Sequence, residues 1–161
     1  MKANVNLSRP DSHDGYEVNQ LVKRCKPLDE NSTYCNLLQC DHFADTSVIA
    51  RQNNEVVGFV SGYRVPERPD VLFVWQVAVD DRMRGSGLAT NMLQHLLSRI
   101  EPDFIETTIT ADNQASWALF SRFAERNGSE LSHEDYYLNQ THFKGQHDSE
   151  KLVRIGPIKL Q

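Results

Sequence analysis

Apolar residues recur three and four positions apart in four stretches of the chain, which is the spacing of an amphipathic helix. Two of these stretches begin at residues that cap helices, near Ser12 and near Ser32. The last two are followed by Pro102 and by Gly128, residue types that end helices. The predicted helices carry their apolar faces at Val18–Cys25, Tyr34–Leu38, Leu88–Ile100 and Trp117–Ala124.

Other segments have the patterns of β-strands. Thr46–Arg51 and Glu55–Arg64 are rich in β-branched residues and are separated by a short turn, so they predict a hairpin. Val71–Val79 is almost continuously apolar, which predicts a strand buried on both faces. Further strands are expected at Val5–Leu7, Phe104–Thr110 and Lys151–Leu160.

In chain order the elements read β-α-α-β-β-β-α-β-α-β-β, which predicts a mixed α/β fold with one core. A length of 161 residues suits a single domain, so we expect one domain over residues 1–161. Ser129–Glu150 is polar and has the weakest pattern of the chain.

Charge and cysteine content narrow the class of protein. The chain has 17 Lys and Arg against 22 Asp and Glu, a net charge of −5 that argues against nucleic-acid binding. No window approaches 18 consecutive apolar residues and Met1–Arg9 lacks the apolar centre of a signal peptide, so we expect a cytoplasmic protein without a membrane span. Cys25, Cys35 and Cys40 form no C-x-x-C pair, which predicts reduced thiols and no metal site.

A loop with two glycines lies between the long apolar strand and the third predicted helix. It places unpaired backbone N–H groups at a helix N-terminus, where an anion is stabilised. Gly85 and Gly87 let the backbone approach a phosphate, and Arg82 and Arg84 add positive charge. The loop lacks the Gly-Lys-Ser/Thr of a P-loop, and Thr90 stands where the dinucleotide-binding motif has a small residue. A tight turn without a ligand is the alternative.

The spacing Arg82-x-x-Gly85-x-Gly87 resembles the R/Q-x-x-G-x-G/A motif of the GCN5-related N-acetyltransferase superfamily (GNAT), and the order of elements resembles its fold over nearly the whole chain. The resemblance implies a mixed, mostly antiparallel central sheet flanked by helices, and acetyl-CoA as co-substrate. The cofactor contacts that it implies are Val77, Ala78, Val79, Arg82, Arg84, Gly85, Gly87, Leu88, Ala89, Asn113 and Phe120.

One position departs from the superfamily pattern. Many members have a Tyr seven residues after the Asn that corresponds to Asn113, and this Tyr protonates the leaving thiolate. Phe120 stands there in this chain, so either the thiolate leaves unassisted or another group donates the proton.

Three longer blocks, Pro27–Tyr34, Asp41–Ser47 and Arg64–Val79, resemble one subfamily, the L-2,4-diaminobutyrate acetyltransferases of ectoine biosynthesis. The resemblance implies that the chain forms N4-acetyl-L-2,4-diaminobutyrate and works as a homodimer. Direct transfer in a ternary complex is the expected route, since Cys35 and Cys40 have no evident activating neighbours.

A selective diamine site needs an anion near one amine, and Asp29 is the candidate, with Tyr34 and Trp75 as walls. The alternatives are a helix cap for Asp29 and core packing for the two aromatic residues. His147 and Glu150 resemble the subfamily's polar site residues and are candidates to accept the proton of the amine, the alternative being a solvated loop.

Two other functions remain open from the sequence. The same fold acetylates other small amines, such as polyamines or aminoglycosides. A non-catalytic acyl-CoA sensor is the alternative from another class, and the absence of a Tyr at position 120 keeps it open.

Overall fold

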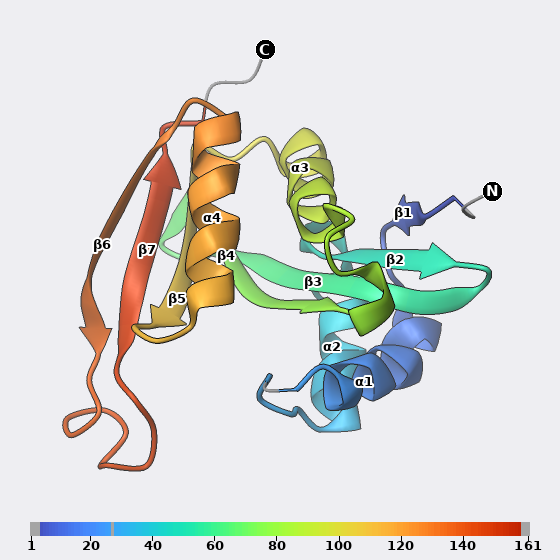
Figure 1. The fold of residues 1–161 in the computed structure, drawn as a ribbon, viewed down its shortest axis with the longest axis horizontal. Coiled ribbons are helices and arrows are strands. Elements are labelled where there is room, and N and C mark those ends of the chain that lie inside the picture. Colours follow the sequence, from blue (N-terminus) through green and yellow to red (C-terminus); the bar gives the residue numbers. More distant parts are fainter. Residues whose placement is uncertain (1–3, 27, 159–161) are drawn as a thin grey trace. The chain divides into compact units, whose positions relative to one another are not determined.

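The computed structural model describes residues 4–26 and 28–158, and its order of helices and strands confirms the predicted order (Figure 1). The helices are α1 (Gly15–Arg24), α2 (Thr33–Asp41), α3 (Leu88–Ile100) and α4 (Gln114–Arg126). The strands are β1 (Asn6–Ser8), β2 (Val48–Gln52), β3 (Glu55–Val65), β4 (Arg68–Val79), β5 (Phe104–Thr110), β6 (Glu130–Tyr137) and β7 (Glu150–Gly156).

Three expectations about the strands need correction. β4 begins at Arg68, so the turn before it is shorter than the sequence suggested. Its second half is not buried on both faces, because the Trp75 ring packs edge-on against other aromatic rings near the surface and stays 42% exposed. β7 starts at Glu150 and ends at Gly156, and the end of the predicted strand, Lys159 and Leu160, lies outside the described residues.

The strands form one sheet in the order β1-β2-β3-β4-β5-β7-β6. β4 and β5 run parallel, whereas β1 with β2, β2 with β3, β5 with β7 and β6 with β7 pair antiparallel. This confirms a mixed, mostly antiparallel sheet flanked by helices. The chain splits into two compact units, Met1–Tyr63 with Val74–Glu101 and Arg64–Phe73 with Pro102–Gln161.

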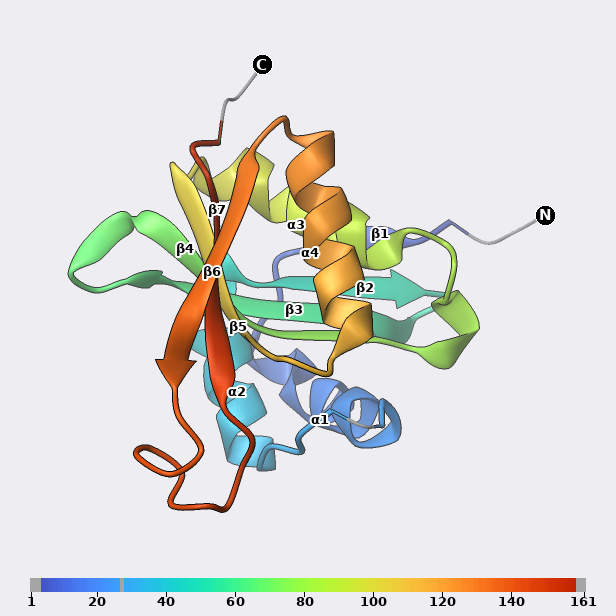
Figure 2. The same cartoon turned by 60° about the vertical axis from the view of Figure 1, so that its left-hand side comes forward.

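In the first unit, helices cover both faces of the hairpin of β2 and β3. α1 and α2 lie on one side of these strands and α3 lies on the other (Figures 1 and 2). Gly58 on β3 makes the α3 contact close, because a Cβ there would come within 3.0 Å of Leu88 and Met92. The core on the α1 side is formed by Val18, Leu21, Val22, Cys25, Cys40, Ile49, Val56, Phe59 and Ala78.

In the second unit, α4 packs along β5 and β7 and buries Phe120 and Phe123 (Figure 1). β6 is an edge strand and most of its side chains are exposed. On β5, the carboxylate of Glu106 is only 2% exposed, and Arg68 and Arg154 each donate to it at 2.6 Å. Burial raises the pKa of Glu106, but hydrogen bonds from the two guanidinium groups outweigh burial and hold this pKa below its usual value.

Candidate functional site

The loop after β4 has the geometry of an anion site. Gly85 and Gly87 have φ values of 76° and 80°, in the left-handed region that favours glycine, and a Cβ at either position would meet no atom within 4 Å. The first hydrogen bond of α3 runs from the Asn91 N–H to the Gly87 carbonyl, and no side chain caps the helix at Gly87. The amides of Leu88 and Ala89 therefore lie before the helical ladder, at the end of the helix where an anion is stabilised.

The loop is held at its start by Asp80, which is 5% exposed and ends the β4 segment. Its carboxylate accepts hydrogen bonds from the Arg82 amide and the Arg82 guanidinium, both at 3.0 Å, and from Arg24 Nε at 3.1 Å. The bonds from Arg82, with the weaker help of Arg24, lower the pKa of Asp80 to about 2. Asp80 thus remains a carboxylate throughout the neutral range and joins the loop to the end of α1.

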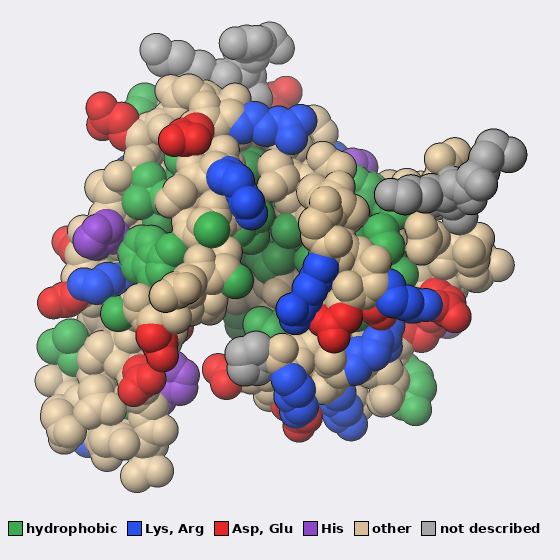
Figure 3. Space-filling model, in the orientation of Figure 1, with side chains coloured by type: hydrophobic (Ala, Val, Ile, Leu, Met, Phe, Trp, Pro, Cys, Tyr) green, Lys and Arg blue, Asp and Glu red, His purple; other side chains and the backbone are tan. Residues whose placement is uncertain are grey.

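The two arginines of the loop have different surroundings. Arg82 forms ion pairs with Asp80 and, at 2.9 Å, with Glu55 on β3. Arg84 forms an ion pair with Asp81 at 2.9 Å, and its side chain is 71% exposed. Figure 3 shows Lys and Arg side chains interspersed with Asp and Glu over α1 and this loop. Arg82 therefore also holds the loop in place, whereas Arg84 is an exposed surface cation.

The end of β4 is fixed on its α1 side. Ala78 is fully buried in the core, and Val77 and Val79 are half-buried. The Cys25 thiol donates to the Val79 carbonyl at 3.3 Å, and the Asp80 amide donates to the Val57 carbonyl at 2.9 Å. The strand that the resemblance assigns to the cofactor arm is thus anchored to both α1 and β3.

Further back on β4, Trp75 belongs to a cluster of three aromatic rings. Its centroid lies 6.0 Å from that of Phe43 and 5.8 Å from that of Tyr63, in edge-to-face geometry. Trp75 is therefore neither a core residue nor a free surface residue. Its ring packs against Phe43 and Tyr63 and is otherwise exposed. Its role as a wall of the substrate site stays a prediction.

The segment before α2 is tied to the same strand. Gln76 accepts a hydrogen bond from Asn31 Nδ2 at 2.9 Å and donates one from Nε2 to the Asp29 carbonyl at 3.2 Å. These bonds bring Asp29 to the strand that carries Trp75. Tyr34 follows in the first turn of α2 and is 69% exposed.

In the second unit, Glu150 is the first residue of β7 and not part of a solvated loop, because it pairs with Thr110 of β5 and Tyr137 of β6. Its Oε2 accepts a hydrogen bond from Thr108 Oγ1 at 3.1 Å. His147 lies in the preceding loop, where Nδ1 donates to the Asp148 carbonyl at 2.6 Å.

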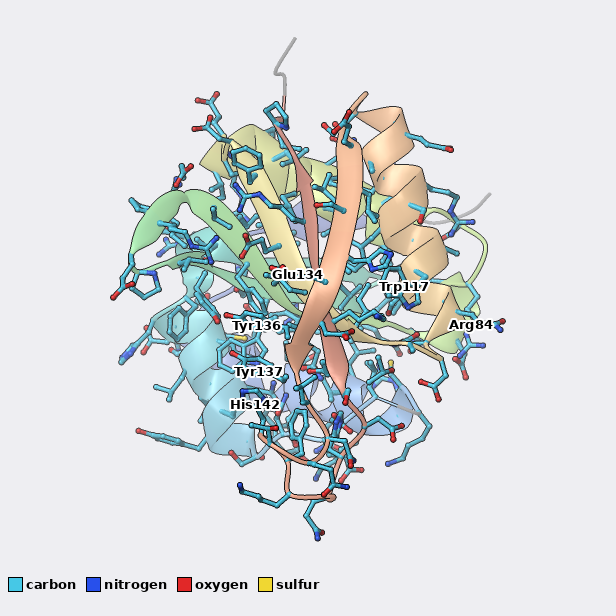
Figure 4. The ribbon with its side chains drawn as sticks, turned by 90° about the vertical axis from the view of Figure 1, so that its left-hand side faces the viewer. Arg84, Trp117, Glu134, Tyr136, Tyr137 and His142 are labelled. Carbon is cyan, nitrogen blue, oxygen red and sulfur yellow. The ribbon has the colours of Figure 1, made fainter. Side chains whose placement is uncertain are left out.

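Aromatic residues continue from the end of β6 into this loop. Figure 4 shows Tyr136, Tyr137 and His142 following one another. The Tyr137 ring lies 4.5 Å from that of Tyr136 and 5.4 Å from that of His142, between centroids. The Leu138 amide donates to His142 Nδ1 at 2.8 Å, so the loop has a defined conformation beside Glu150.

The two α4 residues of the implied cofactor site have structural partners. Asn113 is the N-cap of α4, and its Oδ1 accepts a hydrogen bond from the Ser116 amide at 3.1 Å. Phe120 is 3% exposed and its side chain packs in the core of the second unit. Their roles toward CoA stay predictions.

Sequence reasoning assigned no role to Asp80, Gln76 or Thr108. Gln76 had a usable signal, since it is a polar residue within an almost continuous apolar run. Asp80 also had one, as a capping residue type between a strand and a turn. Thr108 had no such signal, because its role depends on the register of β5 with β7.

Two searches of the described part of the chain found no candidates. Residues 4–26 and 28–158 contain no group of three or more His, Cys, Asp or Glu side chains that could hold a metal ion. No helix within these ranges is long and apolar enough to cross a membrane.

Comparisons with known proteins agree with this geometry. The sequence model of the Acetyltransferase (GNAT) family matches residues 15–124. The chain is 50% identical to the L-2,4-diaminobutyric acid acetyltransferase of Methylotuvimicrobium alcaliphilum over 96% of its length and 92% of the relative's. It is 48% identical to the protein of the same name from Vibrio parahaemolyticus, over 93% and 84% of the two chains.

A solved structure of a diaminobutyrate acetyltransferase has the same fold as this chain. The diaminobutyrate acetyltransferase of Paenibacillus lautus, in complex with its substrate L-2,4-diaminobutyric acid and coenzyme A, superimposes with a TM-score of 0.92. The two chains are 37% identical, and the match covers 99% of this chain and 98% of the other. On the fold, the loop after β4 and these matches, the chain belongs to the acetyltransferase (GNAT) family.

Proposed function

We propose that this chain transfers the acetyl group of acetyl-CoA to the 4-amino group of L-2,4-diaminobutyrate, the step that yields N4-acetyl-L-2,4-diaminobutyrate in ectoine biosynthesis. The observation that carries the proposal is the 50% identity, over 96% of this chain and 92% of the relative, with a protein named for that activity. The enzyme is therefore an N-acetyltransferase whose co-substrate is acetyl-CoA.

The residues after β4 fit a CoA pyrophosphate. The glycine backbone leaves open space above the loop, and the amides of Leu88 and Ala89 offer donors at the positive end of α3. Arg84 supplies exposed positive charge next to them. Val77 and Val79 present strand backbone to the pantetheine arm, and an N–H of this strand is the donor that we assign to the thioester carbonyl.

The residues before α2 and on β4 fit the diamine. The Asp29 carboxylate attracts the ammonium group that must not react, and Trp75 and Tyr34 bound the apolar part of the substrate. Holding one amine in this way presents the other amine to the thioester. Selectivity then follows from the position of Asp29 relative to the cofactor arm.

The reacting amine has to lose a proton before it attacks. An alkylamine pKa near 10.4 makes this cost about 4–5 kcal/mol at pH 7. We assign Glu150, directly or with His147 through water, as the acceptor of that proton. The amine nitrogen then forms the C–N bond, the C–S bond breaks, and the CoA thiolate leaves; with Phe120 buried, the thiolate departs without help from that side chain and is protonated afterwards by solvent.

Transfer is direct, within a ternary complex. The cysteines do not provide an acetyl-enzyme route, because burial raises the pKa of the Cys40 thiol to about 12 and also raises the pKa of Cys35. Neither thiol is a ready thiolate at neutral pH.

The whole chain acts as one catalytic domain in this proposal. The matched family region, residues 15–124, includes parts of both compact units, and each of the close relatives matches over most of its length. Three free cysteines suit the reducing cytoplasm, where we place the enzyme.

A substrate panel tests the activity. The purified chain with acetyl-CoA should acetylate diaminobutyrate faster than ornithine, lysine, spermidine or an aminoglycoside, and NMR of the product should show acetylation at N4. Faster acetylation of another amine would contradict diaminobutyrate as the substrate. Tight CoA binding without turnover on any amine would favour an acyl-CoA sensor. Radiolabelled acetyl-CoA without amine should leave no covalent label on the protein.

Glu150→Gln tests the proton acceptor. The substitution removes the basic oxygen but keeps the size and the bond with Thr108, so kcat should fall by about 10²-fold or more while the Kd for CoA changes little. Stopped-flow turnover and calorimetric titration with CoA measure the two quantities. An unchanged kcat would return Glu150 to a structural role in the strand pair.

Asp80→Asn tests the anchor of the CoA loop. Loss of the charge weakens the bonds to Arg82 and Arg24, so the Kd for CoA should rise by about fivefold to tenfold. With a folded pKa of about 2, below the usual value, the carboxylate contributes fully above about pH 4 and is lost only as the pH falls through 2. The wild-type Kd should therefore show no Asp80 step between pH 5 and 8. Asp41→Asn, an exposed change at the end of α2, is the matched control.

We also propose that the enzyme is a homodimer. The end of β6, an edge strand, leaves Tyr136, Tyr137 and Leu138 each about 40% exposed, which is unusual for a row of large apolar side chains. Light scattering should give the mass of two chains, and Tyr137→Asp should lower it toward that of one. A single-chain mass for the wild type at micromolar concentration would contradict the dimer.

A further inference from the structure

Gln76 interrupts the apolar run of β4, and its side chain both accepts and donates a hydrogen bond with the segment before α2. Its Oε1 accepts from Asn31 Nδ2 at 2.9 Å and its Nε2 donates to the Asp29 carbonyl at 3.2 Å. One bond needs an acceptor and the other a donor, so together they determine the orientation of the carboxamide. On the β4 side, residues 29–31 are therefore held by this one side chain.

The same segment is held from the side of α1. Asn19 is completely buried, and its Nδ2 donates to the Asn31 carbonyl at 2.8 Å and to Asn36 Oδ1 at 2.9 Å. Asn36 in turn donates to Gln39 Oε1 at 2.8 Å. A connected set of buried hydrogen bonds has one preferred arrangement, because each broken bond leaves a polar group desolvated. Asn31 is thus fixed from α1 and from β4 at once.

The residue before Gln76 is Trp75, whose ring is supported by Phe43 and Tyr63. β4 therefore carries two neighbouring functions. In the proposed site Trp75 is a wall, and the next residue, Gln76, holds the backbone of Asp29 against β4. The distance from Trp75 to Asp29 therefore depends in part on the hydrogen bonds from Gln76 to Asp29 and Asn31.

This distance decides which amine is presented to the thioester. The two amines of diaminobutyrate are separated by a short carbon chain, so a shift of the ammonium partner by about 1 Å is enough to cost 10²-fold in rate or to let the other amine react. We propose that Gln76 is a positioning residue for amine selection, acting through Asp29 and not by touching the substrate. This inference rests on the proposed function.

Gln76→Leu and Gln76→Glu test the role. Leu removes both bonds, and the KM for diaminobutyrate should rise by about tenfold with a larger share of N2-acetyl product, while the Kd for CoA stays within twofold of wild type. Glu keeps the acceptor for Asn31 and loses the donor to Asp29, so its KM and product ratio should lie between wild type and Leu. Initial rates, calorimetry and NMR of the products give these values.

A double-variant cycle separates action through Asp29 from a general effect. Asp29→Asn should raise the KM by itself, and Gln76→Leu should then add less than twofold in the Asp29→Asn background. Equal factors in both backgrounds would overturn the inference, because Gln76 would then act independently of Asp29.

Gln52→Leu is the matched control, since Gln52 is another half-buried glutamine of the first unit, at the end of β2. It should leave the KM, the product ratio and the Kd for CoA unchanged. If Gln76→Leu fails to fold, as thermal unfolding would reveal, the isosteric Gln76→Glu decides alone. A wild type that does not acetylate diaminobutyrate overturns the proposed function. A wild type that does, with Gln76→Glu indistinguishable from it in KM and product ratio, overturns only the role of Gln76.

Discussion

The position of the loop after β4 depends on a single buried carboxylate. Asp80 accepts hydrogen bonds from the residue two places ahead in the loop and from Arg24 at the end of α1, and its own amide is bound to β3. The carboxylate of Asp80 is buried and would be costly to bury unpaired, whereas Arg24 and Arg82 reach it from partly exposed positions and neutralise its charge. The glycines can therefore adopt their left-handed conformations on a fixed base, and the first amides of α3 point to a defined place.

Glu150, the proposed proton acceptor, is held in place by strand pairing and not by an ion pair. Glu150 sits in a strand ladder between β5 and β6, and Thr108 fixes one of its oxygens. A proton acceptor on a strand keeps its geometry better than one on a loop. The preceding loop adds His147 and aromatic rings in tilted and edge-to-face contact, including the pairs Phe143–His147 and Tyr137–His142. The proposed CoA loop and the proposed proton acceptor are thus both attached to ends of strands: Asp80 directly follows β4, and Glu150 begins β7.

Local sequence patterns were sufficient to predict the helices and strands, but not the contacts between residues that are distant in the sequence. Periodicity gave the order of all helices and strands, including α3 and β5 with their observed bounds, because each residue's face depends on near neighbours. The exposure of Trp75 and the strand position of Glu150 were missed, since both depend on contacts with distant segments. Arg24 and Asp80 are 56 positions apart and Asn31 and Gln76 are 45 apart, so no local rule could pair them. The glycine loop was found from sequence because its function is local.

The two-way hydrogen bonding of Gln76 also limits how the enzyme can be re-engineered. A carboxamide offers a donor and an acceptor together at neutral pH, whereas Glu offers acceptors alone and Lys and Arg offer donors alone. In the proposed diamine site, a version for a longer diamine such as ornithine needs room for one more methylene. We expect that room to come from moving residues 29–31 as a unit, with Gln76, Asn31 and Asn19 redesigned together.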